Sequence, residues 1–388
     1  MKLEGLKVLD LSAFLPGPHM TMMMADHGAD VIMIEPANGT GEPTRVIGET
    51  TPDGVSVWFR NIARGKRSLK LNLKDPAGLD LFLRLAETAD VVVEAFRPGV
   101  VTRLGVDYEA VAARNPSIVY CSISAFGQDS SLARKPAHDT AVQALAGLVD
   151  LARGSDDKPT MPNVPFADVS ASLMALSAIL MALYRRAQTG KGDYIDLAMY
   201  DAAIAWTPNV LGPTFGEDRP PKPKEMRSFG GSALTQLYET SDAEYLAFAG
   251  PEIKFATNLL MALERPDLIE LAKRPPGPDQ APLRAFFAAT FKTKTLAEWR
   301  AFLEPIDCAW SWVRSLKDAF EDPFTVERGM VFTDADGNRH VGPPIKFQNE
   351  PPLPNPAVPG FGEHSREIAA AVGLSDDAIA ELKEKGTI

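Results

Sequence analysis

The chain is poor in the residues that build disulfide frameworks and metal centres. Its 388 residues include only two cysteines, Cys121 and Cys308, and five histidines. Two cysteines make neither a disulfide framework nor a CxxC metal site, and no spacing among the histidines suggests a metal centre. We therefore expect no metal site.

Positive charge and long apolar runs are also scarce. The net charge is −11, which argues against nucleic acid or an anionic membrane as the main partner. The apolar run around 179–183 falls well short of the roughly 18–20 residues that a membrane span needs. The first residues, MKLEGLKVLDLS, show no signal-peptide pattern. These absences predict a soluble, cytoplasmic protein with no membrane partner.

Several common catalytic motifs are missing as well. The sequence contains no GxGxxG, GxxxxGK[ST], GxSxG or HExxH pattern, which weakens dehydrogenase, P-loop and hydrolase interpretations. The first turn, SAFLPGP, supplies Gly17 but lacks the glycine spacing of a dinucleotide site.

What the first half of the chain does contain is an alternation of strand and helix patterns. LKVLDLS, VIMIE, DVVVEAF and SIVYCSIS are typical of buried strands, and helical patterns separate them. This order predicts an α/β fold with a parallel sheet and ligands at the carboxyl ends of its strands. A long helix is expected from near Asp168 to a cap at Gly190.

Composition changes divide the chain into expected domains. The Pro-rich and charged stretch 211–227 is typical of a linker, and a hairpin with its turn near Ser241 follows. We expect a large domain from 1–210 and 335–388, a smaller one from 228–325 and a return linker at 326–334. The stretch 343–362 shows no periodicity and is expected to run over a surface.

Two titratable residues stand where polar loops meet apolar helices. Asp168 follows a Pro-bearing loop, and the helix amides and dipole are expected to favour its ionised form, which suits a nucleophile or a base. Position alone favours an ordinary helix-capping aspartate over these roles. His138, beside Asp139, is either an acid/base group or a residue that caps the helix expected from Thr140.

A basic run stands out in this acidic chain. The run NIARGKRSLKLNLK contains five cations, and FRPGVVTRLG adds two more. These seven could hold the phosphates of a large anionic ligand or simply form a solvated face. They are Arg64, Lys66, Arg67, Lys70, Lys74, Arg97 and Arg103.

Taken together, these segments resemble the class III CoA-transferase family, the carnitine and bile-acid group that also contains the α-methylacyl-CoA racemases. The matching stretches run in order along the whole chain and include GLKVLDLSAFLPGP, ARGKRSLKLNLK, DVVVEAFRPGVVTRLG, HDTAVQALAGL, RRAQTGKGDYIDLAMYDA and GEHSREI. The resemblance implies a doubly wound, Rossmann-like large α/β domain, a smaller inserted α+β domain and a homodimer whose subunits interlock.

The resemblance also assigns roles to positions of this chain. The catalytic aspartate falls on Asp168, with Asp139, Glu252 and the Gly230-Gly231 pair as supporting residues. A coenzyme A thioester is then a substrate and not a resident cofactor, and a carboxylic acid is the second partner. The positions implied to contact CoA are Phe14, Leu15, Leu71, Asn72, Lys74, Ala95, Phe96, Arg97 and Arg103.

Two reactions of the family use the aspartate differently. In a formyl-CoA transferase-like enzyme Asp168 forms a mixed anhydride and then an aspartyl-CoA thioester, whereas in a racemase His138 and Asp168 exchange the α-proton of a 2-methylacyl-CoA. His138-Asp139 resembles the racemases. VQALAGL, and the absence of a glycine cluster in VSAS after Asp168, resemble the transferases, which we favour. A non-catalytic CoA-binding paralogue is a third, remote alternative.

Overall fold

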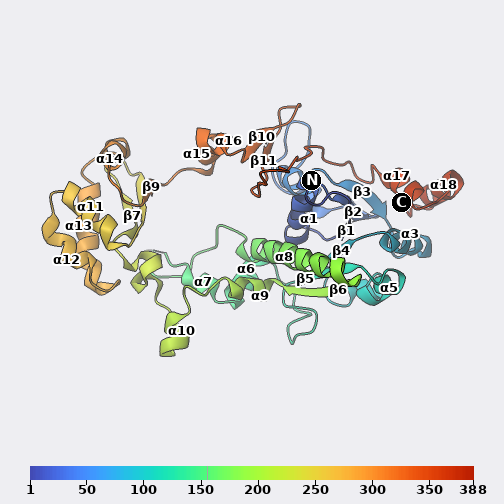
Figure 1. The fold of residues 1–388 in the computed structure, drawn as a ribbon, viewed down its shortest axis with the longest axis horizontal. Helices are drawn as coiled ribbons and strands as arrows, with labels where there is room; N and C mark the ends of the chain where they lie inside the picture. The colour runs from blue at the N-terminus through green and yellow to red at the C-terminus, as the bar shows by residue number, and fades with distance from the viewer. Residues whose placement is uncertain (155) are drawn as a thin grey trace. The chain divides into compact units, whose positions relative to one another are not determined.

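The computed structural model describes residues 1–154 and 156–388 and divides the chain into two compact units. The large unit comprises Met1–Leu148, Pro162–Trp206 and Pro323–Ile388, and the small unit comprises Val149–Met161 and Thr207–Asp322. Figure 1 shows both units in one ribbon. Both ends of the chain therefore contribute to the large unit.

A six-stranded parallel sheet forms the centre of the large unit. Its strand order is β3-β2-β1-β4-β5-β6, so β1 and β4 are neighbours at the point where the order reverses. The strands are β1 (Lys7–Leu11), β2 (Asp30–Pro36), β3 (Arg67–Leu71), β4 (Val91–Glu94), β5 (Val119–Ser124) and β6 (Asp193–Ala198). The four strands expected from apolar runs in the first half of the chain are confirmed.

Helices cover both faces of this sheet and bury two separate cores. On one face pack α1 (Pro16–Asp26), α6 (Asp139–Leu145), α8 (Phe166–Thr189) and α9 (Met199–Ala205). On the other pack α3 (Pro76–Glu87), α5 (Tyr108–Arg114), α17 (Ser365–Ala371) and α18 (Asp376–Glu384). Figure 1 shows α1 beside α8, and α17 and α18 near α3. A parallel sheet covered on both faces explains why every residue of the inner strands β4 and β5 is buried.

Shorter elements complete the large unit. They are η1 (Pro43–Val46), α2 (Val57–Ala63), α4 (Val100–Leu104), α16 (Pro323–Glu327), β10 (Val331–Thr333) and β11 (Arg339–Val341), while α7 (Leu148–Leu151) crosses the boundary between the units. The segment 343–360 contains no helix or strand, as its lack of periodicity predicts, and it is tied to the large unit where Ala357 accepts a hydrogen bond from the Gly65 N–H.

The small unit packs helices against a three-stranded antiparallel sheet. Its strands, in the order β7-β8-β9, are β7 (Thr235–Glu239), β8 (Tyr245–Ala249) and β9 (Trp310–Trp312). The expected hairpin is therefore present. Its helices and turns are α10 (Gly212–Glu217), η2 (Pro223–Glu225), η3 (Arg227–Gly231), α11 (Ile253–Ala262), η4 (Pro266–Leu268), α12 (Ile269–Ala272), η5 (Pro278–Gln280), α13 (Ala281–Phe291), α14 (Leu296–Leu303) and α15 (Leu316–Glu321).

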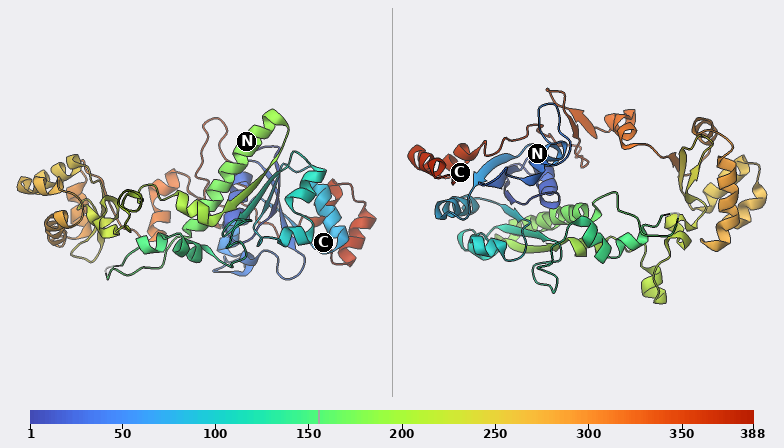
Figure 2. Two further views of the ribbon diagram at one scale, coloured as in Figure 1. Left: turned by 90° about the horizontal axis from the view of Figure 1, so that it is seen from below. Right: turned by 180° about the vertical axis from the view of Figure 1, so that it is seen from behind.

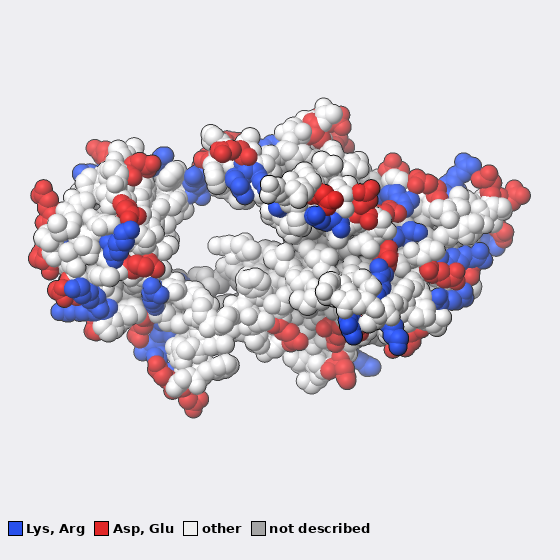
Figure 3. All heavy atoms as spheres, viewed as in Figure 1, with Lys and Arg blue, Asp and Glu red and all other residues white. Residues whose placement is uncertain are grey.

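The linkers expected from composition are structured segments of the two units. The stretch 211–227 lies in the small unit and contains α10 and η2, while 326–334 lies in the large unit and contains β10. On the face of the molecule in Figure 3, acidic and basic side chains are interspersed over both units.

Helix α8 corrects one expectation. It has 24 residues, and an 18-residue window of it has a mean hydropathy of 1.9, so it is long and apolar enough to cross a membrane. The expectation of no such stretch was wrong because the apolar residues continue from 166 to beyond 183. One face of α8, including Ala171, Ala175 and Ile179, is buried in the core on this side of the sheet. The ribbon of this helix lies against the sheet in Figure 2. The helix ends at Gly190 in the left-handed conformation, as predicted.

The two cysteines lie in different environments. Cys121 is fully buried in β5, and burial raises the pKa of its thiol above the usual range. Cys308 lies in the small unit and is only partly buried, and partial burial raises its pKa to about 11.

Candidate active site

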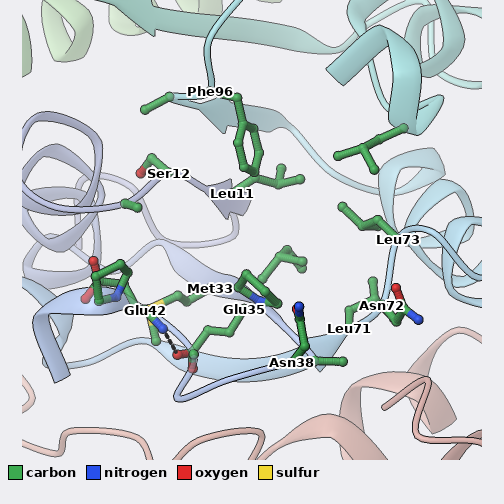
Figure 4. A pocket seen from close by; sticks show the side chains of 18 of the residues that line it. Leu11, Ser12, Met33, Glu35, Asn38, Glu42, Leu71, Asn72, Leu73 and Phe96 are labelled. Carbon is green, nitrogen blue, oxygen red and sulfur yellow. Dashed lines mark hydrogen bonds between the residues drawn. The ribbon is translucent and has the colours of Figure 1, made fainter. Parts of the chain in front are cut away.

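A cavity of about 660 Å³ opens at the carboxyl ends of four adjacent strands of the large unit. Its walls come from the residues that follow β1, β2, β3 and β4, at the place where the strand order reverses. Ligands bind at this point in open parallel sheets. In Figure 4, Phe96 and Leu11 project from neighbouring strand ends into the cavity, with Glu35, Glu42 and Asn72 on its other sides.

Seven of the nine positions implied to contact CoA line this cavity. They are Phe14, Leu71, Asn72, Lys74, Ala95, Phe96 and Arg97. Leu15 and Arg103 are not among the lining residues, although Arg103 is exposed on α4 next to the segment that carries Arg97. The cavity thus has apolar walls, with the cations Lys74 and Arg97 also in its lining.

Most of the basic run has a structural role. Arg64 is buried and pairs with Asp26 through hydrogen bonds of 3.0 and 2.6 Å. Arg67 pairs with Asp30 at 2.6 Å and with Glu367 at 3.0 Å. The hypothesis that the run as a whole holds phosphates is therefore wrong for these two cations, since their charges are already paired.

Lys66 anchors the loop that connects β1 to α1. Its side chain is completely buried, and its ammonium group donates to Asp10 at 3.1 Å and to Thr21 at 2.7 Å. Burial lowers the pKa of Lys66, and the Asp10 carboxylate opposes that change. This lysine, like the two arginines, is unavailable to phosphates.

The same loop contains a position that only glycine fits. Asp10 also accepts a hydrogen bond from the Ser12 N–H at 3.0 Å, which folds the loop back on its strand. A Cβ on Gly17 would lie 2.1 Å from Ser12 Oγ, far inside contact distance. The glycine therefore permits close packing of loop and helix and does not form a dinucleotide turn.

Asp168 lies in the first turn of α8, but it does not cap the helix. Pro165 occupies the N-cap position, and the cap itself is supplied by Asp139 from α6. Asp139 Oδ1 accepts the N–H groups of Ala167 at 2.8 Å and Asp168 at 3.2 Å, and its other oxygen is held by Gln143 at 2.6 Å. The interpretation of Asp168 as an ordinary cap is therefore wrong.

The proton affinity of Asp168 also differs from expectation. Burial, and secondly the negative charge of Asp139, raise the pKa of Asp168 to about 7. The expectation that helix amides keep it ionised was wrong, because those amides are bound to Asp139. Within residues 1–154 and 156–388 we find no hydrogen bond to the Asp168 carboxylate, so its oxygens are free to react.

His138 stands next to Asp139 on the exposed side of the same segment. It occupies the N-cap position of α6, yet its side chain makes no capping hydrogen bond. Its ring meets the ring of Phe14 edge-on, with 5.6 Å between the centroids. No partner in the described part of the chain orients the imidazole as a base.

The remaining predicted residues belong to the small unit. Gly230 has a left-handed backbone with φ of 96°, and Gly231 packs so closely that a Cβ would lie 2.5 Å from the Glu225 backbone. The Gly231 carbonyl accepts a hydrogen bond from Arg284 at 2.6 Å, so the glycine pair is bonded to the small unit's own framework. Glu252 is exposed and pairs with Arg227 at 3.6 Å.

Sequence reasoning missed two carboxylates of the cavity, Glu35 and Glu42. Both are buried, and the Glu42 N–H donates to Glu35 at 2.8 Å, the contact dashed in Figure 4. Glu42-Pro43 does carry a signal, because an acid before proline is typical of a helix start. That signal predicts the 3₁₀ turn η1 but not the contact of Glu42 with the first loop.

The chain belongs to CoA-transferase family III, whose family model matches residues 3–365. It is 30% identical to succinyl-CoA:glutarate CoA-transferase of Mus musculus over 100% of this chain and 90% of the relative. It is also 30% identical to α-methylacyl-CoA racemase of Homo sapiens, over 98% of this chain and 96% of that relative. A CaiB/BaiF family protein from Brucella suis has a similar structure, with a TM-score of 0.83 at 30% identity over 95% of this chain and 99% of that one. The predicted family is confirmed, and with it an acyl-CoA enzyme.

Proposed function

We propose that this protein is a CoA-transferase that moves CoA from a donor acyl-CoA to an acceptor carboxylic acid through covalent intermediates on Asp168. The Asp168 carboxylate attacks the thioester carbonyl, the C–S bond breaks, and a mixed anhydride and CoA thiolate form. The thiolate then attacks the aspartyl carbonyl, releases the donor carboxylate and leaves an aspartyl-CoA thioester.

The acceptor acid completes the reaction by the same steps in reverse. Its carboxylate attacks the aspartyl-CoA thioester and forms a second anhydride while the thiolate leaves. The thiolate attacks the acceptor's carbonyl, which gives the product acyl-CoA and regenerates Asp168. Shielding of both anhydrides from water is assigned to the Gly230-Gly231 segment.

The observation that carries this proposal is the state of Asp168. It is partly buried, its pKa is about 7, and Asp139 occupies the helix amides that would otherwise hold its oxygens. A carboxylate with free oxygens and a pKa near neutrality is more nucleophilic than one held by several donors. His138, by contrast, is exposed and its ring packs edge-on against Phe14, which suits a residue that lines the site.

Trapping the covalent intermediate tests the mechanism. During turnover with a donor acyl-CoA, hydroxylamine is expected to convert the activated Asp168 to a hydroxamate that mass spectrometry locates in the peptide containing Phe166. Asp168→Asn serves as the control and should give no adduct. Full acyl exchange by wild-type enzyme without any modification at Asp168 would contradict the proposed intermediate.

A racemase is the second candidate, favoured by the histidine next to Asp139 and by the similarity to the human racemase. In that reaction His138 and Asp168 would lie on opposite sides of the α-carbon and exchange its proton. Incubation of a 2-methylacyl-CoA in D₂O separates the two. α-Proton exchange without an acceptor acid supports the racemase, and exchange of the acyl group only with an acceptor supports the transferase.

The loop that connects β1 to α1 suggests which class of acyl group the enzyme accepts. Phe14 and Leu15 are apolar, so we propose a branched, aromatic or other bulky apolar acid over a small dicarboxylate. Coenzyme A is assigned to the cavity, with Lys74, Arg97 and Arg103 as the cations for its phosphates. A thermal-shift screen of acyl-CoAs tests this assignment: the largest stabilisation is expected from apolar acyl chains, and preference for a dicarboxylate would contradict it.

We also propose that the small unit is an inserted domain and that the protein works as an interlocked homodimer in the cytoplasm. An apolar strip on the outer face of α8 supports this assembly. It consists of Leu173, Leu180, Met181 and Tyr184, which recur at helical spacing and are 37–72% exposed. Contiguous exposed apolar residues of this kind are typical of subunit contacts.

A further inference from the structure

Phe14 has an unusual backbone for a large residue. Its φ is +66°, in the left-handed region that non-glycine residues seldom occupy. Its side chain is 38% exposed, so burial in a core does not hold it in place. Strained residues of this kind persist when their surroundings fix them, and they cluster at functional sites.

The group that fixes Phe14 is the carboxylate of Glu42. Glu42 Oε1 accepts the Phe14 N–H at 2.8 Å, across 28 positions of sequence. The other oxygen, Oε2, accepts the Thr44 N–H at 2.7 Å and the Thr44 hydroxyl. Glu42 thus uses one oxygen to cap the turn η1 and the other to hold the first loop.

Glu42 is itself held rigidly. It is only 3% exposed, and its own N–H donates to Glu35, whose carboxylate is fixed by Arg45 through two contacts of 2.7 Å. This chain of bonds connects the end of β2 to the loop after β1. A carboxylate that is fixed in this way can hold Phe14 in one place, because its own hydrogen bonds keep it from moving.

Phe14, the residue that Glu42 holds, contacts two parts of the site. Phe14 lines the cavity, and its ring is edge-on to the ring of His138. His138 adjoins Asp139, which binds the first turn of α8 at Asp168. Phe14 therefore connects the cavity to the segment that leads to Asp168.

We propose that Glu42 is a positioning residue that sets the place of the acyl thioester by holding Phe14 in its left-handed conformation. This inference rests on the proposed function, since it assigns the cavity to CoA and the reacting carbonyl to the Asp168 side of the Phe14 ring. It predicts that Glu42 influences the chemical step more than CoA binding.

A double-mutant cycle tests the inference. Glu42→Gln keeps the size of the side chain but replaces one acceptor oxygen with an NH₂ group, so the Thr44 and Phe14 N–H groups no longer both find acceptors. We expect kcat to fall about 10- to 100-fold, as for a misplaced reacting group. The KM for acyl-CoA and the Kd of CoA by calorimetry should change less than about threefold.

The cycle distinguishes positioning from a general loss of structure. In the background Phe14→Gly, which accepts the left-handed backbone but lacks the ring, Glu42→Gln should change kcat less than about twofold. Equal losses in both backgrounds would overturn the inference. Thr44→Val is the matched control, because it removes a hydrogen bond to the same carboxylate but leaves the Phe14 contact, and it should keep the wild-type ratio of kcat to KM.

The design separates this inference from the proposed function. If wild-type enzyme transfers acyl groups but Glu42→Gln keeps its kcat, only the role of Glu42 is wrong. If wild-type enzyme transfers no acyl group from any acyl-CoA, the proposed function fails, and the inference fails with it. Should Glu42→Gln not fold, Glu42→Asp, which shortens the side chain by one methylene, is judged by the same criteria.

Discussion

The protonation of Asp168 couples activity to stability. Its pKa of about 7, against 3.8 for a free aspartate, means that the folded protein keeps a proton that the unfolded chain releases over this pH range. Stability contributed by the protonated form is therefore complete below about pH 4 and is lost as the pH rises through 7. The nucleophile, in contrast, is the deprotonated form.

Asp168→Asn should consequently abolish acyl transfer and stabilise the fold at high pH. Each pKa unit corresponds to about 1.4 kcal/mol, and solvent screens a partly exposed group, so we expect a gain of about 1–2 kcal/mol at pH 8. At pH 4 the variant and wild type should be nearly equal. Urea unfolding at the two pH values measures this difference. A variant that is less stable than wild type at pH 8 would contradict the raised pKa of Asp168.

A substitution of Asp139 tests whether its charge raises the pKa of Asp168. Asp139→Asn keeps an oxygen that can accept the α8 amides but removes the charge that raises the pKa of Asp168. The rise of kcat/KM with pH should move to lower pH by about one unit, while burial keeps it above the value for a free aspartate. Gln143→Leu is the control, because it loosens Asp139 without removing its charge. An unshifted profile in Asp139→Asn would argue against the electrostatic coupling.

At the scale of elements, the loop between β1 and α1 depends on one buried ion pair. Lys66→Met leaves the Asp10 carboxylate buried without its cation and should cost about 3–5 kcal/mol of unfolding free energy. Arg67→Met, at the next position, removes two partly exposed ion pairs and should cost about 0–1 kcal/mol. Chemical denaturation compares the two, and similar losses would show that the loop does not rely on Lys66.

The elements themselves could be predicted from sequence where their periodicity is strong. The strands ending at Leu11, Glu94 and Ser124 and the helix ending before Gly190 all follow from apolar runs and turn residues. The cap of α8 could not be predicted in this way, because Asp139 is 29 positions from Asp168 and only tertiary packing brings it to the helix. The pKa of Asp168 was misjudged for the same reason.

The residues of the site also divide into those that sequence predicts and those that only tertiary packing determines. Positions such as Leu71, Asn72 and Phe96 follow from the family resemblance and do line the cavity. The burial of Arg64 and Lys66 was not predictable, since a run of cations looks alike in sequence whether it faces solvent or a buried acid. Glu42 was missed because its contact with Phe14 joins the ends of two different strands.

At the scale of the whole molecule, the α8 strip makes the proposed dimer testable. Met181→Glu places a charge in the middle of the exposed apolar face and should convert dimer to monomer, raising the dissociation constant at least about tenfold. Arg84→Glu adds negative charge to an exposed position of α3, on the opposite face of the sheet, and should leave the assembly unchanged. Sedimentation velocity measures both variants, and a dimeric Met181→Glu would remove α8 from the interface.

The unequal burial of the two cysteines has a practical consequence for following the enzyme in solution. Only Cys308, which is partly exposed in the small unit, should react with a maleimide dye, while Cys121 stays protected inside β5. Because partial burial raises the pKa of Cys308 to about 11, labelling should be slow at pH 7 and faster at pH 9. One dye per chain would then be attached without mutagenesis, and its anisotropy on addition of acyl-CoA would report the response of the small unit during catalysis.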